Sequence, residues 1–381
     1  MSRIDVPPRM FRWARDRAGL PAEALVRRFP HLEAWERGAV RPTLKQLETF
    51  AKAVRVPIGY LFLPEPPEEP LPIPDFRTVR GVEQPRTSPD LLDTIYAMQR
   101  RQAWLREALV EGEADPLGFV GSARLSDSPE ASGREMRRTI GFGDGWAAEV
   151  RTWQEAVSRL RQAVEELGVM TVINGVVGNN THRKLDVREF RGFALCDTHA
   201  PLIFVNGADA RSAQMFTLAH ELAHVWVGSE GVSGFEDLFP GGSPIEEFCD
   251  RAAAEFLVPE RELTAYWSEV RRSGRPFEDL ARRFKVSPIV AARRAMDVHL
   301  VDRETFFSFY RAYVGEERRR SDGSGGGDFY NNQNTRVGAL FATHVVRAAM
   351  EGRIGFKDAY DLTGLRAGTF QQYARRLGFE F

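Results

Sequence analysis

Cysteine is scarce in this chain of 381 residues, which contains only Cys196 and Cys249. Two cysteines cannot build the disulfide framework of a small secreted domain, so a reducing cytoplasm is the expected setting. Long apolar runs are also missing, because no stretch approaches the roughly 20 residues that a membrane helix needs. The first residues are charged and lack the apolar segment of a secretory signal. We therefore expect a cytoplasmic protein without a membrane partner.

The chain has almost no net charge, with 52 Lys and Arg against 53 Asp and Glu. This balance hides an asymmetry, since residues 1–60 hold twelve basic and six acidic residues and the remainder holds 40 and 47. A basic head on an acidic body favours nucleic-acid binding by the head, although a solvated arginine-rich surface explains the same charge. The hydrophobic content of 43% is typical of globular proteins, and the length predicts two or three domains.

Proline and glycine gather at two places that we interpret as linkers. Six of the twelve residues in PEPPEEPLPIPD, residues 64–75, are proline, which favours an extended spacer. The segment SDGSGGGDFYNN, residues 321–332, is rich in glycine and serine. We predict five parts: an N-terminal domain over 1–63, a Pro-rich linker over 64–80, a central domain over 81–320, a flexible linker over 321–334 and a helical segment over 335–381.

The central domain changes from helix to strand and back to helix along its length. Short β-branched and aromatic runs bounded by Gly, Asn and Asp indicate strands over 168–177, 190–197 and 200–207. We expect helices over 88–115, 146–167, 210–227 and 244–257 and onward to about 315, with a loop around 121–134. This order predicts an α+β domain with a three-stranded sheet.

Two of the seven histidines lie one helical turn apart in TLAHELAHVWVG. His220 and His224 share one helix face, so both imidazoles can reach one zinc ion, with Glu221 placed to bind a water on that ion. Glu246 follows on the next predicted helix as a third ligand, and Asp250 can accept the other ring N–H of a ligating histidine. We expect one zinc ion per chain, although manganese or iron could occupy such a site in the cell.

These motifs resemble two groups of metallopeptidases. HELAH followed by Glu-x-x-x-Asp resembles the thermolysin-like (gluzincin) zinc peptidases. The strings FRGFALCDTHAPLIFVNG, TLAHELAHVWVG and IEEFCDRAAAEFLVP resemble the ImmA/IrrE family of bacterial and phage metallopeptidases, over about residues 165–300. The resemblance implies a thermolysin-like fold and a zinc endopeptidase in which Glu221 is the general base on zinc-activated water. Family members typically have Asn at the position of Asp250, and either side chain can accept from a histidine.

Several other residues near these motifs are open alternatives. Glu247 competes with Glu246 as a ligand, but its spacing to Asp250 fits the motif less well. The strand over 190–197 could bind an extended substrate by β-addition. We interpret Cys249 as a small buried hydrophobe. The candidates for a donor to the oxyanion are His182, His199 and Tyr266, and the sequence does not choose among them.

The N-terminal segment carries a second resemblance, through HLEAWERGAVRPTLKQLETFAKAVRVPIGYLFL. This string resembles the helix-turn-helix domain of Cro and phage repressors (XRE type) over about 55 residues, and we expect about five short helices there. Gly38 fits a helix C-terminus and Thr43 an N-cap, and the predicted buried stripe of the following helix consists of Leu44, Leu47, Ala51 and Val54. The candidate phosphate contacts are Arg27, Arg28, His31, Arg37 and Arg41. The alternative is a retained fold that binds protein instead of DNA.

The two resemblances together imply a transcriptional regulator whose zinc endopeptidase domain cleaves a partner, such as a repressor, or the chain itself. A homodimer is compatible with this, since repressor-type domains often dimerise. The alternative is an antitoxin of a toxin–antitoxin pair, which uses the peptidase fold to dock a partner with little or no proteolysis. A third possibility is a purely structural zinc, but structural sites usually have four protein ligands, whereas three are visible here.

Overall fold

The computed structural model describes residues 3–20, 22–76, 87–233, 243–320 and 334–380. By its internal contacts the chain divides into two units, described separately below. Unit 1 comprises Met1–Pro72 and Pro85–Ile95, and unit 2 comprises Ile73–Gln84 and Tyr96–Phe381. Within the described ranges, no helix is both long and apolar enough to cross a membrane.

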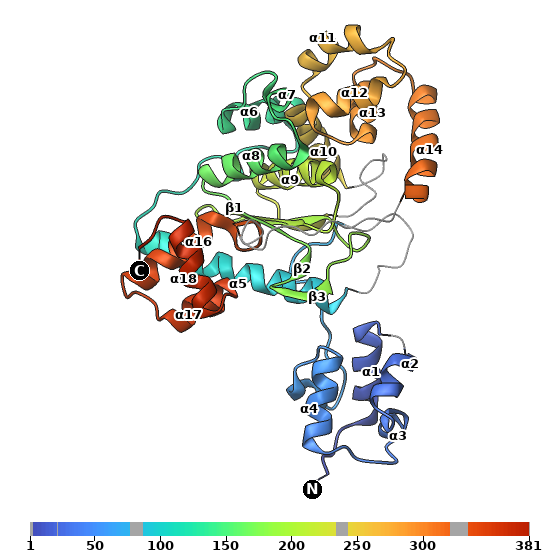
Figure 1. The fold of residues 1–381 in the computed structure, drawn as a ribbon, viewed down its shortest axis with the longest axis vertical. Coiled ribbons are helices and arrows are strands. Elements are labelled where there is room, and N and C mark those ends of the chain that lie inside the picture. Colours follow the sequence, from blue (N-terminus) through green and yellow to red (C-terminus); the bar gives the residue numbers. More distant parts are fainter. Residues whose placement is uncertain (1–2, 21, 77–86, 234–242, 321–333, 381) are drawn as a thin grey trace. The chain divides into compact units, whose positions relative to one another are not determined.

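Unit 1 consists of short helices (Figure 1), which enclose an aromatic core. The predicted five helices are present as α1 (Pro8–Ala18), α2 (Ala22–Arg28), α3 (Leu32–Glu36), α4 (Leu44–Ala53) and the 3₁₀ helix η1 (Ile58–Phe62). Four buried rings meet between these helices, with centroids between 5.4 and 6.2 Å apart for the contacting pairs. They belong to Phe11, Phe29, Trp35 and Phe50. Tilted and edge-on ring pairs of this kind stabilise a small core beyond the area they bury.

The ends of α3 and α4 agree with the local sequence, but one core position does not. Thr43 accepts a hydrogen bond from the Gln46 amide and its own amide donates to the Gln46 side chain, so the predicted N-cap is confirmed as a capping box. Gly38 follows the end of α3 with φ +70°, as predicted. The predicted burial of Leu44 is wrong, because this first residue of α4 is 49% exposed and Phe50 fills the core instead.

Unit 2 contains a four-stranded sheet in the order β1 (Met170–Asn174), β5 (Leu202–Asn206), β4 (Gly192–Leu195) and β6 (Gly231–Ser233). β5 is parallel to β1 and antiparallel to β4, which is in turn antiparallel to β6. The three predicted strands are present, but the prediction of a three-stranded sheet is wrong because β6 extends it. A separate hairpin pairs β2 (Val176–Val177) with β3 (Asn180–Lys184).

Helices cover both faces of the sheet (Figure 1). α8 (Trp153–Glu166) and α9 (Arg211–Val227) pack on one face, against β1, β4 and β5. Along the other face runs α5 (Pro89–Glu111), of which residues 96–111 belong to unit 2. The Gln102 side chain of α5 donates hydrogen bonds to the carbonyl oxygens of Leu195 and Ala200, at 2.9 and 3.0 Å. The sheet and α9 therefore form the interior of the unit.

Two helix boundaries differ from the sequence-based expectation. The predicted loop around 121–134 is wrong from Pro129 onward, because α6 (Pro129–Ile140) begins there with Ser128 as its N-cap. The predicted helix over 146–167 is divided into α7 (Trp146–Glu149) and α8, which opens with a capping box at Thr152. In both cases a capping serine or threonine starts the new helix.

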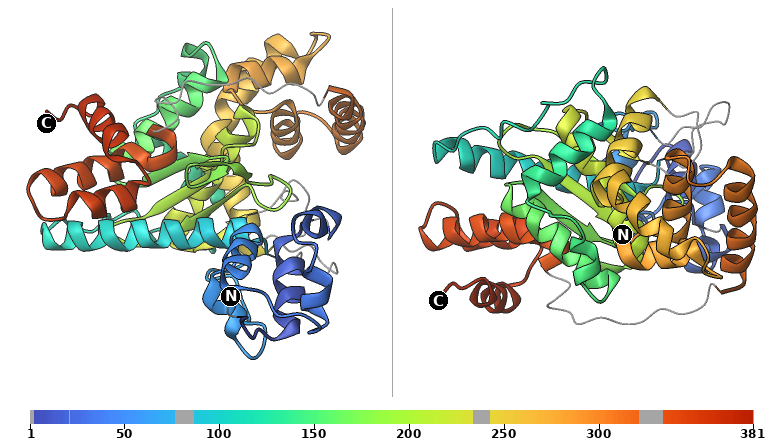
Figure 2. Two further views of the ribbon diagram at one scale, coloured as in Figure 1. Left: turned by 60° about the horizontal axis from the view of Figure 1, so that its bottom comes forward. Right: turned by 90° about the horizontal axis from the view of Figure 1, so that it is seen from above.

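The remaining helices form two groups (Figure 2). The first group contains α10 (Pro244–Leu257), α11 (Glu260–Val270), α12 (Pro276–Phe284), α13 (Pro288–Asp297) and α14 (Arg303–Arg320). The second group contains the π-helix η2 (Asn334–Gly338), α16 (Ala339–Met350), α17 (Phe356–Thr363) and α18 (Ala367–Arg376). The second group lies beside α5, and η2 and α16 contact β1. The C-terminal segment is therefore helical, as the sequence indicates.

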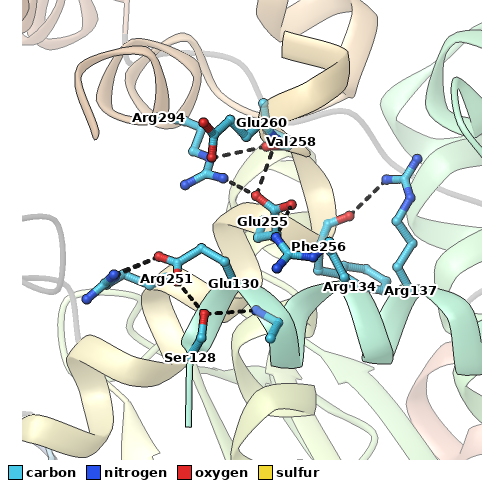
Figure 3. Close-up of polar contacts among 11 residues, drawn as sticks. Ser128, Glu130, Arg134, Arg137, Arg251, Glu255, Phe256, Val258, Glu260 and Arg294 are labelled. Carbon is cyan, nitrogen blue, oxygen red and sulfur yellow. Dashed lines mark hydrogen bonds and ion pairs between the residues drawn. The ribbon is translucent and has the colours of Figure 1, made fainter. Parts of the chain in front are cut away.

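A buried ionic cluster fastens α6 and α13 to the C-terminal half of α10 (Figure 3). Glu255 is paired with the Arg294 guanidinium, and both side chains are almost fully buried. The remaining donors around Glu255 are the Arg134 guanidinium at 3.3 Å and the Glu260 amide at 3.2 Å. Arg137 donates to the Phe256 carbonyl oxygen at 3.0 Å. Each charged group in this cluster has a partner of opposite sign or a carbonyl oxygen.

Candidate metal centre

Two packed helices, α9 and α10, bring the candidate ligands together in the interior of unit 2. The HELAH motif lies in the second half of α9, where His220, Glu221 and His224 are 3%, 0% and 1% exposed. α10 begins at Pro244, with Ser243 accepting a hydrogen bond from the Glu246 amide at 3.4 Å. This cap places Glu246 in the first turn of α10, facing α9.

The side chains of His220, His224 and Glu246 converge on one another. The Glu246 carboxylate lies 3.2 Å from His220 Nε2 through Oε2 and 3.0 Å from His224 Nε2 through Oε1. The two Nε2 atoms are 3.1 Å apart. Each residue thus offers a ligand atom within 4.8 Å of the others, and all three residues are buried. The structure therefore assembles the His–His–Glu set that the spacing predicts.

Asp250 orients one of the two imidazoles. Its Oδ1 lies 2.9 Å from His220 Nδ1, so the ring donates its Nδ1–H to the carboxylate and turns Nε2 toward Glu246. His224 Nδ1 has no hydrogen-bond partner within the described ranges. The cluster brings two imidazole nitrogens and two carboxylate oxygens face to face, so it contains more hydrogen-bond acceptors than donors. Such an arrangement is unfavourable in a buried place unless a proton or a cation lies among these atoms. Two histidines and one glutamate are a ligand set of catalytic zinc sites, so these residues fit the ion.

The pKa shifts in the metal-free cluster also indicate that a proton or a cation lies among these side chains. Burial opposes charge on His220, but the Glu246 carboxylate and the Asp250 hydrogen bond raise the pKa of His220 well above 6.5. Burial lowers the pKa of His224. For Glu246 burial favours the neutral form, yet the two histidines lower the pKa to about 2. Without metal the cluster therefore retains a proton on His220, which a bound cation would displace.

The catalytic candidate Glu221 is fully buried beside β4. A Cβ atom on Gly192 would lie 2.8 Å from Glu221 Oε1 and 2.7 Å from Thr217 Cγ2, so only glycine fits where β4 passes this helix. Gly192 is thus a residue of the site that sequence reasoning missed. The only local signal is a glycine at the start of a strand in FRGF, which does not reveal that it faces α9.

The other candidates from the sequence lie apart from the cluster. Glu247 is exposed, unlike its neighbour Glu246, and is not part of the converging set. His182 is exposed in β3. The Arg283 guanidinium lies over the Tyr266 ring, 4.3 Å from the ring centroid. His199 donates its amide to Asp197 at 2.8 Å. Cys249 is fully buried in the core, and burial raises its thiol pKa well above 9, which confirms its interpretation as a small hydrophobe.

The strand over 190–197, considered above as a possible place for β-addition, is not an edge strand. β4 pairs with β5 on one side and β6 on the other, so its backbone groups are already used and the strand is part of the sheet interior. The edge belongs to β6. There the Val232 amide donates to the Pro74 carbonyl oxygen at 3.0 Å, and the Phe76 amide donates to the Val232 carbonyl oxygen at 3.1 Å. Phe76 also stacks on the His224 ring, with centroids 5.6 Å apart and planes at 13°.

The candidate DNA contacts lie in unit 1 and are all exposed. They are Arg27 and Arg28 at the end of α2, His31 before α3, and Arg37 and Arg41 after it. Arg41 forms an exposed ion pair with Asp5 at 3.3 Å, and the Arg28 guanidinium lies 5.5 Å from the centroid of the Phe29 ring. Exposed pairs of this kind contribute little stability, so these side chains are available to a ligand.

A buried His–His–Glu cluster on two packed helices, with a glutamate beside the first histidine, defines a metallopeptidase-like site. Comparison with known proteins agrees, since residues 164–296 match the family model of the IrrE N-terminal-like domain. The radiation response metalloprotease IrrE of Deinococcus radiodurans is 33% identical over 96 residues, which is 24% of this chain and 29% of that relative. The match thus spans less than a third of the relative's length. Residues 337–376 match a domain of unknown function.

Proposed function

We propose that unit 2 is a zinc-dependent endopeptidase within a transcriptional regulator, and that it cleaves a partner protein such as a repressor, or the chain itself. The observation that carries this proposal is the buried convergence of His220, His224 and Glu246, with Glu221 on the same helix. The similarity of residues 164–296 to a metalloprotease domain supports it.

The residues of the site have distinct tasks in peptide hydrolysis. A zinc ion held by His220, His224 and Glu246 would supply Lewis-acid activation of water and of the peptide carbonyl. The Glu221 carboxylate accepts a proton from the attacking water and passes it to the leaving amine nitrogen. Asp250 keeps the His220 ring in one tautomer and orientation. Burial of Glu221 keeps its carboxylate away from bulk water.

Unit 1 is the proposed DNA-binding part of this regulator. The exposed Arg27, Arg28, His31, Arg37 and Arg41 support phosphate contacts. A mobility-shift titration at several salt concentrations tests this. Binding by phosphate contacts weakens with salt, and the double substitution of Arg27 and Arg28 by alanine should reduce the slope of that dependence by about two. A slope unchanged by the double substitution would contradict the assignment.

The second candidate function is an antitoxin or another binding module, which docks a partner on the peptidase fold with little or no proteolysis. One observation favours it: Phe76 covers a face of His224, and a site used only for docking has no need to admit a peptide bond. The two functions differ in whether Glu221 matters chemically.

The substitution Glu221→Gln separates the two functions. It preserves the shape of the side chain but removes the base, so the variant should bind zinc and fail to cleave. Intact-mass analysis of the purified chain and of its cellular partners measures cleavage, and Glu247→Gln is the matched control because Glu247 is exposed beside the site. Full biological activity in Glu221→Gln would contradict the protease and favour the binding module.

A further inference from the structure

The outer edge of β6 is occupied by the chain's own residues Ile73–Phe76. Two backbone hydrogen bonds join Val232 to this segment, one to the Pro74 carbonyl oxygen and one from the Phe76 amide, and Asp75 forms a parallel bridge with Val232. Ile73 is 5% exposed and anchors the segment among buried side chains. The segment thus forms a single β-bridge on the edge of the sheet, within unit 2.

The Phe76 ring packs against two residues, His224 and Gly231. Its ring stacks on His224, one of the candidate ligands. On β6, a Cβ atom at Gly231 would lie 2.0 Å from Phe76 Cε2 and 2.2 Å from its Cδ2. Gly231 does not adopt a left-handed backbone, so its conformation alone does not demand glycine. The missing side chain at this position makes room for the Phe76 ring.

This segment lies on the only sheet edge that adjoins the cluster in the described structure. β4 is paired on both sides, and β1, at the far end of the sheet, packs against η2. An extended polypeptide gains its main-chain hydrogen bonds by adding to a free strand edge. With Ile73–Phe76 in place, the carbonyl oxygen and amide of Val232 are already used.

We propose that the edge of β6 and the face of His224 on which Phe76 stacks form a docking surface for an extended peptide with an aromatic side chain, and that Ile73–Phe76 is its resident intramolecular occupant. A protein substrate enters only by displacing this segment, with an aromatic residue taking the place of Phe76. The identity of the incoming chain as a substrate rests on the proposed function. The docking of the segment itself does not.

Hydrogen–deuterium exchange of the full chain, in zinc-free buffer, measures the docking directly. Wild type is compared with Phe76→Ala and with Phe62→Ala, which removes an exposed ring of unit 1 and serves as the control. We expect exchange at the amides of Phe76 and Val232 to become at least about tenfold faster in Phe76→Ala and to remain unchanged in Phe62→Ala. Equal exchange in wild type and Phe76→Ala would overturn the proposal.

Peptide binding tests whether the vacated edge accepts another strand. A fluorescein-labelled EEPLPIPDF, the sequence of residues 68–76, should bind Phe76→Ala at least about tenfold more tightly than wild type, because no attached aromatic competes. Equal affinity for both proteins would overturn the proposal. A purely structural role for Phe76 would loosen the segment without creating peptide binding.

Gly231→Ala displaces the Phe76 ring from the opposite side and leaves the segment's own sequence intact. It should accelerate exchange at Val232 in the wild-type background and add little in Phe76→Ala, where no ring remains to collide. Additive effects would show that the two residues act separately and would contradict the docking. These measurements need no turnover. If the protein binds the peptide but never cleaves a substrate, only the proposed protease function is contradicted. If it cleaves a substrate but Phe76→Ala changes neither exchange nor peptide binding, only the docking of Ile73–Phe76 is contradicted.

Discussion

Helix α10 carries two buried charged clusters that differ in how their charges are paired. Near its C-terminus Glu255 meets the Arg294 guanidinium and the Glu260 amide, so the carboxylate is satisfied by protein groups (Figure 3). Near its N-terminus the Glu246 carboxylate lies within ion-pair distance of two imidazoles, those of His220 and His224. The first arrangement is complete as it stands, whereas the second has acceptors turned toward one another. The difference separates a structural ion pair from a site that needs a ligand.

The largest expected effect is on the structural side of this comparison. Arg294→Met should lower the free energy of unfolding by about 3–5 kcal/mol, because it leaves the Glu255 charge buried with only the half-exposed Arg134 as a cationic partner. Glu246→Gln in the metal-free protein should cost less, since His220 can release its proton once its partner is gone. Urea unfolding of both variants in chelator measures these losses, and an equal or larger loss in Glu246→Gln would contradict the difference between the two clusters.

On the metal side, Gly192→Ala should affect catalysis more than metal binding. The added Cβ pushes on Glu221 Oε1, and displacing a general base lowers turnover by about 10²–10⁴-fold. Zinc content should not change. The matched control is Gly274→Ala, because a Cβ at Gly274 has nothing within 4 Å. Turnover is measured well below the unfolding temperature of each variant, and normal turnover in Gly192→Ala would argue against Glu221 as the base.

In the proposed metal centre Asp250 would act through His220, so the effect of changing it should be smaller. Asp250→Ala should weaken zinc affinity by about 10–100-fold, while Asp250→Asn, which retains an acceptor for the ring N–H, should weaken it less. Competition with a zinc-binding dye gives the affinities. Arg251→Ala is the control on the next position of α10, where Arg251 pairs with Glu130 instead. If Asp250→Ala and Arg251→Ala bind zinc equally well, Asp250 does not position the ligand.

The smallest expected effect is on the pH dependence of stability. At the His–His–Glu cluster, stability should fall at both low and high pH. The lowered pKa of Glu246 contributes stability above pH 4.5 that is lost as the pH falls toward about 2. The raised pKa of His220 contributes stability below pH 6.5 that is lost as the pH rises through its folded value. Thermal unfolding in chelator should therefore show Glu246→Gln differing most from wild type between pH 4.5 and 6.5. A difference that does not vary with pH would contradict the charged pair.

Local patterns predicted the parts of the site that lie within one or two helices. The spacing of His220 and His224 places both on one face of α9, and the Thr43 capping box was predictable for the same reason, because its partners are three residues apart. β6 has only three residues, too few for a recognisable alternation. Leu44 was predicted to be buried because it continues the apolar periodicity of α4. It lies in the first turn of the helix, where the side chain is exposed.

Long-range contacts account for what the sequence did not predict. Gly192 matters because it faces Thr217 and Glu221 of α9, and Gly231 matters because it faces Phe76. Phe76 lies there because a proline-rich segment pairs with β6. The residues adjacent in sequence to Gly192, Gly231 and Phe76 do not indicate these contacts. The sequence of 190–197 identifies a strand, but its position between β5 and β6 is decided by the sheet as a whole.

The most direct test of the metal centre is the zinc content of purified, untagged protein, measured by elemental mass spectrometry after zinc is supplied and the excess removed. Wild type and Glu247→Gln should each hold one zinc ion per chain, and Glu246→Gln should hold far less than one. The two variants differ by one position on α10 and by burial, since Glu246 is buried and Glu247 is exposed. A wild-type protein that takes up no zinc, or a Glu246→Gln variant that retains a full equivalent, would contradict the metal centre.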